Sequence, residues 1–374
     1  MEIIQALMAF SLFTAVGQSP SPVAWKHDPG LFEPFWNSGT MRGESLLFVA
    51  ETPEALPAAK LLFSPLKVLK IQDPALAKEF VQGRDYVWKP DDRAISLPKG
   101  SSIPFKTPAD LIRPPKSQRH ALTRCDGKGE ILFGGGHEYH DMQVTVTYEH
   151  RLDEWKGGNP AIGGANLTRV RGKLPGKETV SIALLGDSIS TGCNASGWAG
   201  TAPFQPAWQD LVRAGLEASR GAKVALHNFS VGGTSSAWGL KNIDKVIDVK
   251  PDLVIIAFGM NDSAGVPAAQ YTANIRGMID AVRKRNPDAE FILVATMQGN
   301  ADWVTLKQEL FPAYREALAG MVGPGVALAD LTGVWKEMLR HKADRDLTGN
   351  GVNHPNDFGH RVYAQVLLAL LQGP

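Results

Sequence analysis

The chain has 374 residues, of which 44% are hydrophobic and 21% are charged, a composition typical of a folded protein and not of a disordered one. Lysine and arginine number 39 against 38 acidic residues, so the net charge is +1 and gives no electrostatic reason to expect nucleic acid or an anionic membrane as a partner. We therefore expect neither partner, and the length predicts two domains.

Residues 1–17, MEIIQALMAFSLFTAVG, form an apolar stretch that ends in the small residues Ala15 and Gly17. The stretch is shorter than the roughly 20 residues that span a bilayer, so we expect no membrane span. We interpret it as a cleaved signal peptide in which Glu2 stands where a basic residue is usual; a buried helix is the alternative. A signal peptide predicts a secreted or periplasmic protein, in which Cys125 and Cys193 form either one disulfide or two free thiols.

Residues 20–176 are rich in proline and glycine and contain short β-like runs separated by turns. The segment 142–150, MQVTVTYEH, alternates in the period of two that a half-buried strand requires. The other clear runs are 44–51, 58–71 and 85–89. These runs predict an antiparallel β-rich accessory domain, either a β-sandwich or a jelly-roll-like sheet, that ends near residue 176.

Residues 177–374 change to an alternation of short apolar runs and segments with helical spacing. Five buried strands are predicted at 179–185, 223–229, 252–258, 290–295 and 326–330, and helices at 207–219, 268–285, 305–322 and 357–371. This alternation predicts an α/β fold, a parallel sheet with helices on both faces. Ligands of such sheets bind at the carboxyl ends of the strands.

Chemically useful residues follow several of these predicted strands. Ser188 comes after the first strand, Gly232 and Gly233 after the second, and Asn261 after the third, while His354 precedes the last helix. A serine nucleophile, a histidine base and hydrogen-bond donors for an oxyanion are the groups that ester cleavage needs. Their placement predicts a hydrolytic site at the carboxyl edge of the sheet.

The blocks GDSIS, NFSVGG, GMND and NHP occur in the order found in the SGNH hydrolase superfamily, also called the GDSL family, which residues 177–374 resemble. The resemblance implies a three-layer, flavodoxin-like sheet. It also implies that Ser188 is the nucleophile and His354 the general base. The implied oxyanion donors are Ser188, Asn261 and Gly233, the last chosen over Gly232 by the family spacing from Asn228.

The sequence departs from the family pattern at the catalytic acid. The family places an aspartate three residues before the histidine, and that position is Gly351 here. Asp346 is one candidate replacement, and Asp344 is another. Asp357 could also serve, although capping of the last helix explains it. The remaining alternative is a serine–histidine dyad in which a backbone carbonyl orients His354.

Other candidate ligands have ordinary explanations. His137 and His140 have a helical spacing, but they precede a predicted strand and have no obvious third ligand, so we expect neither a metal nor another cofactor. Trp198 and Trp238 flank the serine and glycine segments and could form a flat platform for a sugar ring, or belong to the core.

Together these features predict a secreted serine esterase that cleaves short-chain, acetyl esters of a carbohydrate through an acyl-enzyme on Ser188. An accessory β-domain, export, and the lack of long apolar loops that could hold an acyl chain favour acetyl removal from a polysaccharide. A lipase or thioesterase of the same superfamily is the first alternative. A non-catalytic carbohydrate-binding protein on this scaffold is the second, and the missing aspartate is its main support.

Overall fold

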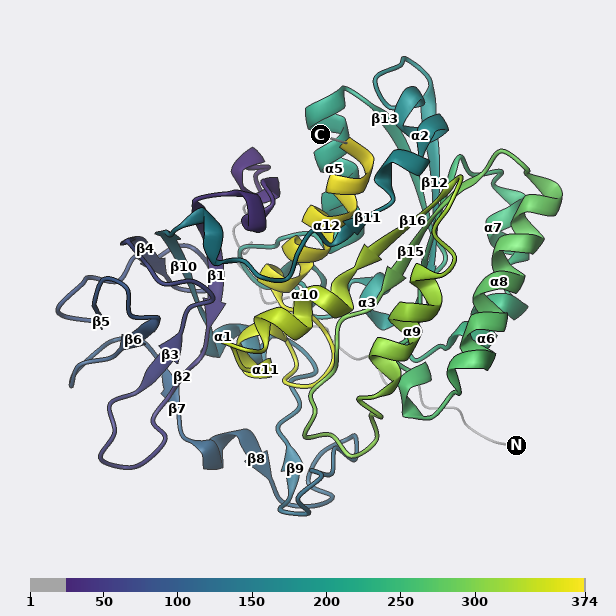
Figure 1. The fold of residues 1–374 in the computed structure, drawn as a ribbon. Helices are drawn as coiled ribbons and strands as arrows, with labels where there is room; N and C mark the ends of the chain where they lie inside the picture. Colours follow the sequence, from purple (N-terminus) through teal and green to yellow (C-terminus); the bar gives the residue numbers. More distant parts are fainter. Residues whose placement is uncertain (1–24, 373–374) are drawn as a thin grey trace, which may run out of the picture.

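The structure, a computed structural model, describes residues 25–372, and a six-stranded sheet lies at the centre of its C-terminal half (Figure 1). The strands lie in the order β11-β16-β15-β14-β12-β13. Their bounds are β11 (Ala161–Ile162), β12 (Thr179–Gly186), β13 (Lys223–Asn228), β14 (Leu253–Ala257), β15 (Glu290–Ala295) and β16 (Val326–Asp330). Strands β12 to β16 are parallel, and β11 joins the edge antiparallel to β16. Numbered along the chain, the parallel strands have the order 2-1-3-4-5, which confirms the flavodoxin-like sheet.

Helices cover both faces of this sheet (Figure 1). Ile182 and Leu184 of β12 belong to one hydrophobic core, whereas Ala183 and Leu185 belong to a second core on the opposite face. This alternation is the period of two that a strand imposes on its side chains. Helices α5 (Trp208–Arg220), α10 (Leu331–Met338) and α12 (Asp357–Gln372) contribute to the first core; α6 (Ser236–Lys241), α7 (Asp244–Asp248), α8 (Ala268–Arg285) and α9 (Leu310–Ala319) contribute to the second. The predicted three layers are therefore confirmed.

The prediction that all five strands are buried is wrong for β13. Its central residues are only half-buried, whereas every residue of β14, β15 and β16 is buried. The reason is position, because β13 lies at the edge of the sheet and pairs with β12 alone. Its apolar residues therefore do not show whether the strand is central or at an edge.

Helix α9 is shorter than the segment 305–322 predicted for it. The helix begins at Leu310, two residues before Pro312, and ends at Ala319. Proline has no N–H to donate to a preceding turn, so it is tolerated in the first turn of a helix but not further inside. The helix therefore cannot extend back to residue 305.

The N-terminal region is rich in strands, as expected. A three-stranded antiparallel sheet has the order β1-β10-β4, and a five-stranded sheet has the order β5-β6-β3-β2-β7, in which β2 and β7 are parallel. The strands are β1 (Thr40–Leu46), β2 (Phe48–Val49), β3 (Ala58–Lys60), β4 (Lys67–Gln72), β5 (Val87–Trp88), β6 (Ala94–Ser96), β7 (Phe105–Lys106) and β10 (Val144–Glu149), with a hairpin of β8 (Ile112–Arg113) and β9 (Glu130–Ile131). The parallel pair departs from the expected all-antiparallel arrangement.

Short helices connect these elements. The α-helices are α1 (Glu138–Met142), α2 (Thr168–Lys173), α3 (Ser188–Thr191), α4 (Ser196–Ala199) and α11 (Asp344–Leu347). The 3-10 helices are η1 (Pro29–Phe32), η2 (Phe35–Asn37), η3 (Pro108–Leu111), η4 (Leu152–Glu154), η5 (Gly164–Asn166) and η6 (Asp262–Ala264). Three of these helices lie near the predicted catalytic residues in the chain: α3 begins with Ser188, α4 follows it, and α11 precedes His354.

The N-terminal and C-terminal regions share one hydrophobic core. Phe48 and Tyr148 of the N-terminal sheets belong to the same cluster of buried side chains as Trp208 and Trp335 of the helical layer. The edge strand β11 also comes from the part of the chain before residue 176. The division into domains at residue 176 remains a prediction. The regions before and after this residue pack against each other in the same hydrophobic core.

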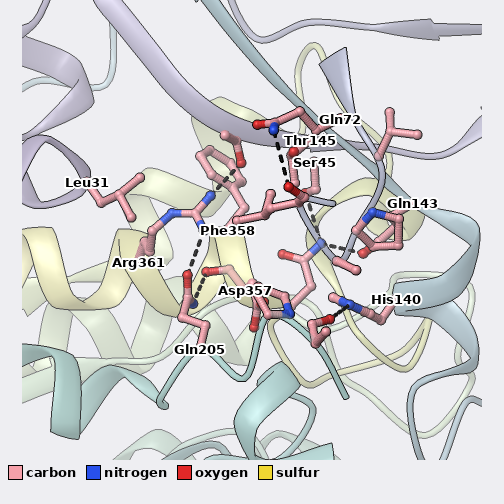
Figure 2. A pocket seen from close by; sticks show the side chains of 18 of the residues that line it. Leu31, Ser45, Gln72, His140, Gln143, Thr145, Gln205, Asp357, Phe358 and Arg361 are labelled. Carbon is pink, nitrogen blue, oxygen red and sulfur yellow. Dashed lines mark hydrogen bonds between the residues drawn. The ribbon is translucent and has the colours of Figure 1, made fainter. Parts of the chain in front are cut away.

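A cavity of about 530 Å³ lies where the three-stranded sheet faces the beginning of α12 (Figure 2). Arg361 is buried in its wall and donates a hydrogen bond of 2.7 Å to Gln205 Oε1. Asn356 and Asp357 also line the cavity, but Ser188 and His354 do not. The cavity is therefore separate from the serine–histidine pair.

Three sequence expectations concern termini, membranes and thiols. The predicted signal peptide, residues 1–17, lies outside the described residues. Within residues 25–372, no helix has the length and apolar character needed to cross a membrane. Cys125 and Cys193 are both free thiols in this structure.

Candidate active site

Ser188 is the first residue of α3 and follows directly from the turn at the end of β12. Asp187 caps α3, because its Oδ1 accepts a hydrogen bond of 3.0 Å from the N–H of Ile189. The chain packs closely here because residue 186 is glycine: a Cβ on Gly186 would lie 2.5 Å from Ser190 Oγ. The turn places Ser188 at the carboxyl edge of the sheet with 8% of its surface exposed.

His354 faces Ser188 from the loop before α12, and its Nε2 lies 2.9 Å from Ser188 Oγ. Asn350 holds this loop, because its side-chain Oδ1 accepts hydrogen bonds from three backbone N–H groups. The donors are Val352, Asn353 and His354, at 2.9, 2.9 and 3.1 Å. The fold thus brings together the two residues that the sequence predicts as nucleophile and base.

Asp346, the first candidate for the catalytic acid, does not contact His354. Its Oδ1 accepts a hydrogen bond of 2.9 Å from the N–H of Leu47, and its Oδ2 accepts one of 3.1 Å from the N–H of Ala343. The carboxylate therefore caps the first turn of α11 and links that helix to Leu47 in the N-terminal region. Among the residues that the structure describes, no hydrogen bond joins Asp344 to His354 either.

The interpretation of Asp357 as the cap of the last helix is wrong. Asn356 caps α12, since its Oδ1 accepts a hydrogen bond of 3.0 Å from the N–H of Gly359. Asp357 Oδ1 instead accepts a hydrogen bond of 2.8 Å from the N–H of Ser196, which ties α12 to α4. The carboxylate of Asp357 thus links α12 to α4 and, within the part of the chain that the structure describes, makes no hydrogen bond to His354.

The partner of His354 Nδ1 is Asn194, a residue that sequence reasoning missed. Asn194 Oδ1 lies 2.8 Å from Nδ1. Its side chain is buried, and its backbone has a φ of 65°, a left-handed conformation that asparagine tolerates better than most residues. The one sign in the sequence that Asn194 could act in the site is its position in the segment that follows Ser188. Asparagine is common in turns because of its backbone conformation, so its presence there does not by itself indicate a functional role.

The three expected oxyanion donors, Ser188, Gly233 and Asn261, follow the carboxyl ends of β12, β13 and β14. The N–H of Ser188 is at the first position of α3, where an α-helix offers no acceptor. Asn261 Nδ2 donates to Thr234 O at 2.8 Å and retains a second hydrogen. Gly232 lies against Ser188, since a Cβ there would be 3.7 Å from Ser188 Cβ, and Gly233 follows it with a φ of 77°. The donor roles themselves stay predictions.

Burial controls protonation at this site. It lowers the pKa of His354 from 6.5 to about 4, so the imidazole is neutral at neutral pH and can accept a proton. Burial has the opposite effect on a carboxyl group and raises the pKa of Asp187 to about 7. It also raises the pKa of Asp262, whose oxygens accept hydrogen bonds from the N–H and hydroxyl of Ser236. Asp187 and Asp262 therefore act in the framework around the pair.

The two histidines considered as metal ligands have other partners. His140 is buried in the middle of α1, and its Nε2 lies 2.7 Å from Ala202 O. His137 is exposed, and its Nδ1 lies 2.7 Å from Asp141 Oδ2. Across residues 25–372, no group of three or more histidine, cysteine, aspartate or glutamate side chains is arranged to hold a metal ion.

The parallel three-layer sheet with a serine–histidine pair at its carboxyl edge defines a serine hydrolase. The sequence profile of the GDSL-like Lipase/Acylhydrolase family matches residues 184–362, just under half of the chain, and this match supports a carboxylic ester hydrolase. No curated protein matches the chain.

Solved structures similar to this one include several esterases. A two-domain esterase, CEX, active on acetylated mannans, shares 21% identity; the match covers 58% of this chain and 56% of CEX, with a TM-score of 0.44. The lipase/acylhydrolase from Enterococcus faecalis shares 25% identity over 50% of this chain and 93% of its own, with a TM-score of 0.41. The acetyl xylan esterase Axe2 from Geobacillus stearothermophilus shares 19% identity. The match covers 51% of this chain and 94% of Axe2, with a TM-score of 0.41. The chain thus spans only about half the length of CEX.

Proposed function

We propose that this protein is a secreted serine esterase that removes acetyl groups from a carbohydrate. The observation that carries the chemistry is the 2.9 Å approach of His354 Nε2 to Ser188 Oγ within a GDSL-like domain. No metal or organic cofactor takes part in the proposed reaction, because a serine nucleophile with a neutral histidine base can cleave an ester unaided.

In the acylation step, His354 Nε2 takes the proton of Ser188 as Oγ attacks the ester carbonyl carbon. The carbonyl oxygen becomes an oxyanion and accepts hydrogen bonds from the N–H groups of Ser188 and Gly233 and from Asn261 Nδ2. The carbon–oxygen bond to the alcohol then breaks, and His354 returns the proton to the leaving alcohol. These steps leave an acyl-enzyme on Ser188.

In the deacylation step, His354 takes a proton from a water molecule, which attacks the acyl carbon through the same oxyanion. Collapse of this intermediate releases the carboxylic acid, and the proton passes from His354 back to Ser188 Oγ. Each residue thus returns to its starting state. The low pKa of His354, about 4, keeps the base ready for both steps at neutral pH.

The preference for a carbohydrate is supported by one exposed aromatic ring. Trp198 is 48% exposed and lies beside the end of α3, since a Cβ on Gly192 would be 3.9 Å from Trp198 Cδ1. A flat indole face in solvent can receive the apolar face of a sugar ring. Trp238, the other candidate, is only partly exposed and packs against the second core. The proposed platform is therefore Trp198 alone.

Secretion is proposed from residues 1–17, the apolar stretch typical of a signal peptide. Expression of the full chain in a secreting host, followed by N-terminal sequencing of the exported protein, tests this part. Recovery of the exported enzyme with a new N-terminus shortly after residue 17 is expected. Retention inside the cell with Met1 intact would contradict it.

The activity is tested with p-nitrophenyl esters of increasing acyl length and with an acetylated polysaccharide. Acetyl esters should be cleaved much faster than octanoyl esters, and acetate should be released from the polysaccharide. Ser188→Ala and His354→Ala should each lower kcat by several orders of magnitude. Ser190→Ala is the matched control, a buried serine two positions along α3 that should leave kcat unchanged.

The alternatives predict different results in the same assays. A preference for octanoyl esters would make the protein a lipase, and a preference for thioesters a thioesterase. Binding of the polysaccharide without turnover of any ester would make it a carbohydrate-binding protein. Full activity in a folded Ser188→Ala variant would overturn the proposed mechanism.

A further inference from the structure

The N-terminal region fills the space in which the family's catalytic acid would stand. Gly351 occupies that position, three residues before His354, and has a φ of 79°. A Cβ on Gly351 would lie 2.2 Å from Tyr139 Oη and 2.8 Å from Leu132 O. Tyr139 is itself buried, and its hydroxyl donates a hydrogen bond of 3.1 Å to Leu132 O. A side chain at position 351 therefore has neither the space nor the backbone conformation it needs.

The same N-terminal loop holds Asn194. Asn194 Nδ2 donates to the backbone oxygens of Gly136 at 2.9 Å, Gly349 at 3.1 Å and Gly134 at 3.3 Å. A flipped amide would direct its oxygen at three carbonyl oxygens, so the hydrogen-bond network assigns one orientation. In that orientation, Asn194 Oδ1 faces His354 Nδ1.

This contact selects the tautomer of His354. An amide oxygen only accepts hydrogen bonds, so the neutral imidazole must carry its proton on Nδ1. Its Nε2 then has a free lone pair directed at Ser188 Oγ, 2.9 Å away. This is the tautomer that a general base needs, and the one that a triad aspartate maintains in other serine hydrolases.

We propose that Asn194 is the positioning residue for His354, and that the loop from Leu132 to Tyr139 of the N-terminal region holds it in place of the missing acid. The proposal rests on the proposed function, because it assigns a role in the same reaction. It also gives the N-terminal region a part in catalysis, since that region both occupies the position of the acid and orients its substitute.

The first test removes the amide without straining the backbone. Asn194→Gly keeps a residue that tolerates the φ of 65° and deletes the contact to Nδ1. Its kcat should fall by about 10²- to 10⁴-fold, the upper end being the loss seen when a triad residue ceases to maintain the tautomer. The KM should not change, because Asn194 touches no substrate. An unchanged kcat in a folded Asn194→Gly protein would overturn the proposal.

The second test changes the charge on the positioning group. Asn194→Asp keeps one oxygen that can accept from Nδ1–H, but its second oxygen replaces Nδ2 and faces the carbonyl oxygens of Gly134, Gly136 and Gly349, so only a small part of the kcat lost in Asn194→Gly should return. The negative charge favours the imidazolium, so the pKa of His354 should rise and the acid limb of kcat/KM should move to higher pH. The neighbouring His360 stays neutral, because burial lowers its pKa to about 3. An acid limb that does not move would contradict contact with His354.

The third test addresses the N-terminal loop. A Cβ on Gly134 would lie 2.9 Å from Cδ2 of the buried Tyr139 ring, so Gly134→Ala should displace the loop from Asn194 and lower kcat by about tenfold or more. Gly135→Ala is the matched control, because its Cβ would meet Phe133 Cε1 at an ordinary 3.6 Å. Equal kcat values for the two variants would remove the loop from the proposal.

NMR of the imidazole nitrogens separates this proposal from the proposed function. In the wild type, the His354 ring should carry its proton on Nδ1, and Asn194→Gly should lose that single tautomer. This readout needs no turnover, so it tests Asn194 even if Ser188→Ala proves as active as the wild type and the esterase mechanism fails. A wild-type ring protonated on Nε2 would overturn the proposal.

Discussion

Glu44 and Lys342 form an ion pair in which both side chains are completely buried. Glu44 also accepts hydrogen bonds from the N–H of Leu62 at 2.9 Å and the hydroxyl of Tyr148 at 2.6 Å. Lys342 Nζ donates to the backbone oxygens of Ser45 and Lys60, each at 3.1 Å. The pair links β1 to the chain just before α11, and so joins the N-terminal region to the segment that carries His354.

Lys342→Met should destabilise the protein strongly. Removing one partner of a buried pair leaves an uncompensated charge, which typically costs about 3–5 kcal/mol of the free energy of unfolding. Urea denaturation measures this change. Arg340→Ala is the control: Arg340 is largely exposed and pairs with Glu337 at 3.1 Å, so its loss should cost about 1 kcal/mol or less. Equal losses in the free energy of unfolding for Lys342→Met and Arg340→Ala would contradict a stabilising role of the buried Glu44–Lys342 pair.

Asp346→Asn should reduce stability more than catalysis. Its two oxygens accept backbone hydrogen bonds from Leu47 and Ala343, and an amide can replace only one of these acceptors. We expect a loss of about 1–3 kcal/mol in the free energy of unfolding, with kcat within a few-fold of the wild type. A loss of kcat near 10⁴-fold without unfolding would instead make Asp346 the catalytic acid.

Asn261→Ala should lower kcat by about 10²- to 10³-fold with little change in KM, because an oxyanion donor acts mainly in the transition state. Steady-state kinetics with p-nitrophenyl acetate provide both constants. A change confined to KM would assign Asn261 to substrate binding. Since Nδ2 also donates to Thr234 O, a thermal melt of the variant must show that the fold is intact.

Gly351→Asp should not improve the enzyme, although it restores the residue type usual in the family. Its Cβ would overlap Tyr139 Oη at 2.2 Å, and aspartate is strained at a φ of 79°. The melting temperature and kcat should both fall. Combination with Tyr139→Ala removes the overlap with Tyr139 but leaves the 2.8 Å approach to Leu132 O and the backbone strain, so it should recover only part of the stability. A rise in kcat for the single variant would contradict this account.

Activity should persist to unusually low pH. Burial holds the pKa of His354 at about 4, and the imidazole is the active base only when it is unprotonated. The acid limb of kcat/KM should therefore lie near pH 4, with full activity above it. The histidine in the unfolded chain titrates near 6.5, so protonation below that pH favours unfolding, and stability should decline between about pH 6.5 and 4. An acid limb near pH 6.5 would show that His354 is well solvated.

Local patterns in the sequence determined much of the catalytic half. The strand runs, the helix 268–285 and the order of the four motif blocks all depend on residues close together in the chain. Ser188 could be placed at the carboxyl edge because it directly follows a strand, whereas His354 lies beyond α10 and α11, and its pairing with Ser188 came from the resemblance of the motif blocks. The position of β13 at the edge could not be read from its residues, because an apolar strand can occupy either place.

What only the tertiary structure decided is the partner of His354. Asp346 is close to the histidine in sequence, but backbone groups of Leu47 and Ala343 occupy its carboxylate. Asn194 is distant in sequence, and only three carbonyl groups from two separate loops turn its amide oxygen toward Nδ1. Sequence patterns describe neighbours along the chain and residues at strand ends. The orientation of one buried amide depends on hydrogen bonds between segments that meet only in the folded protein.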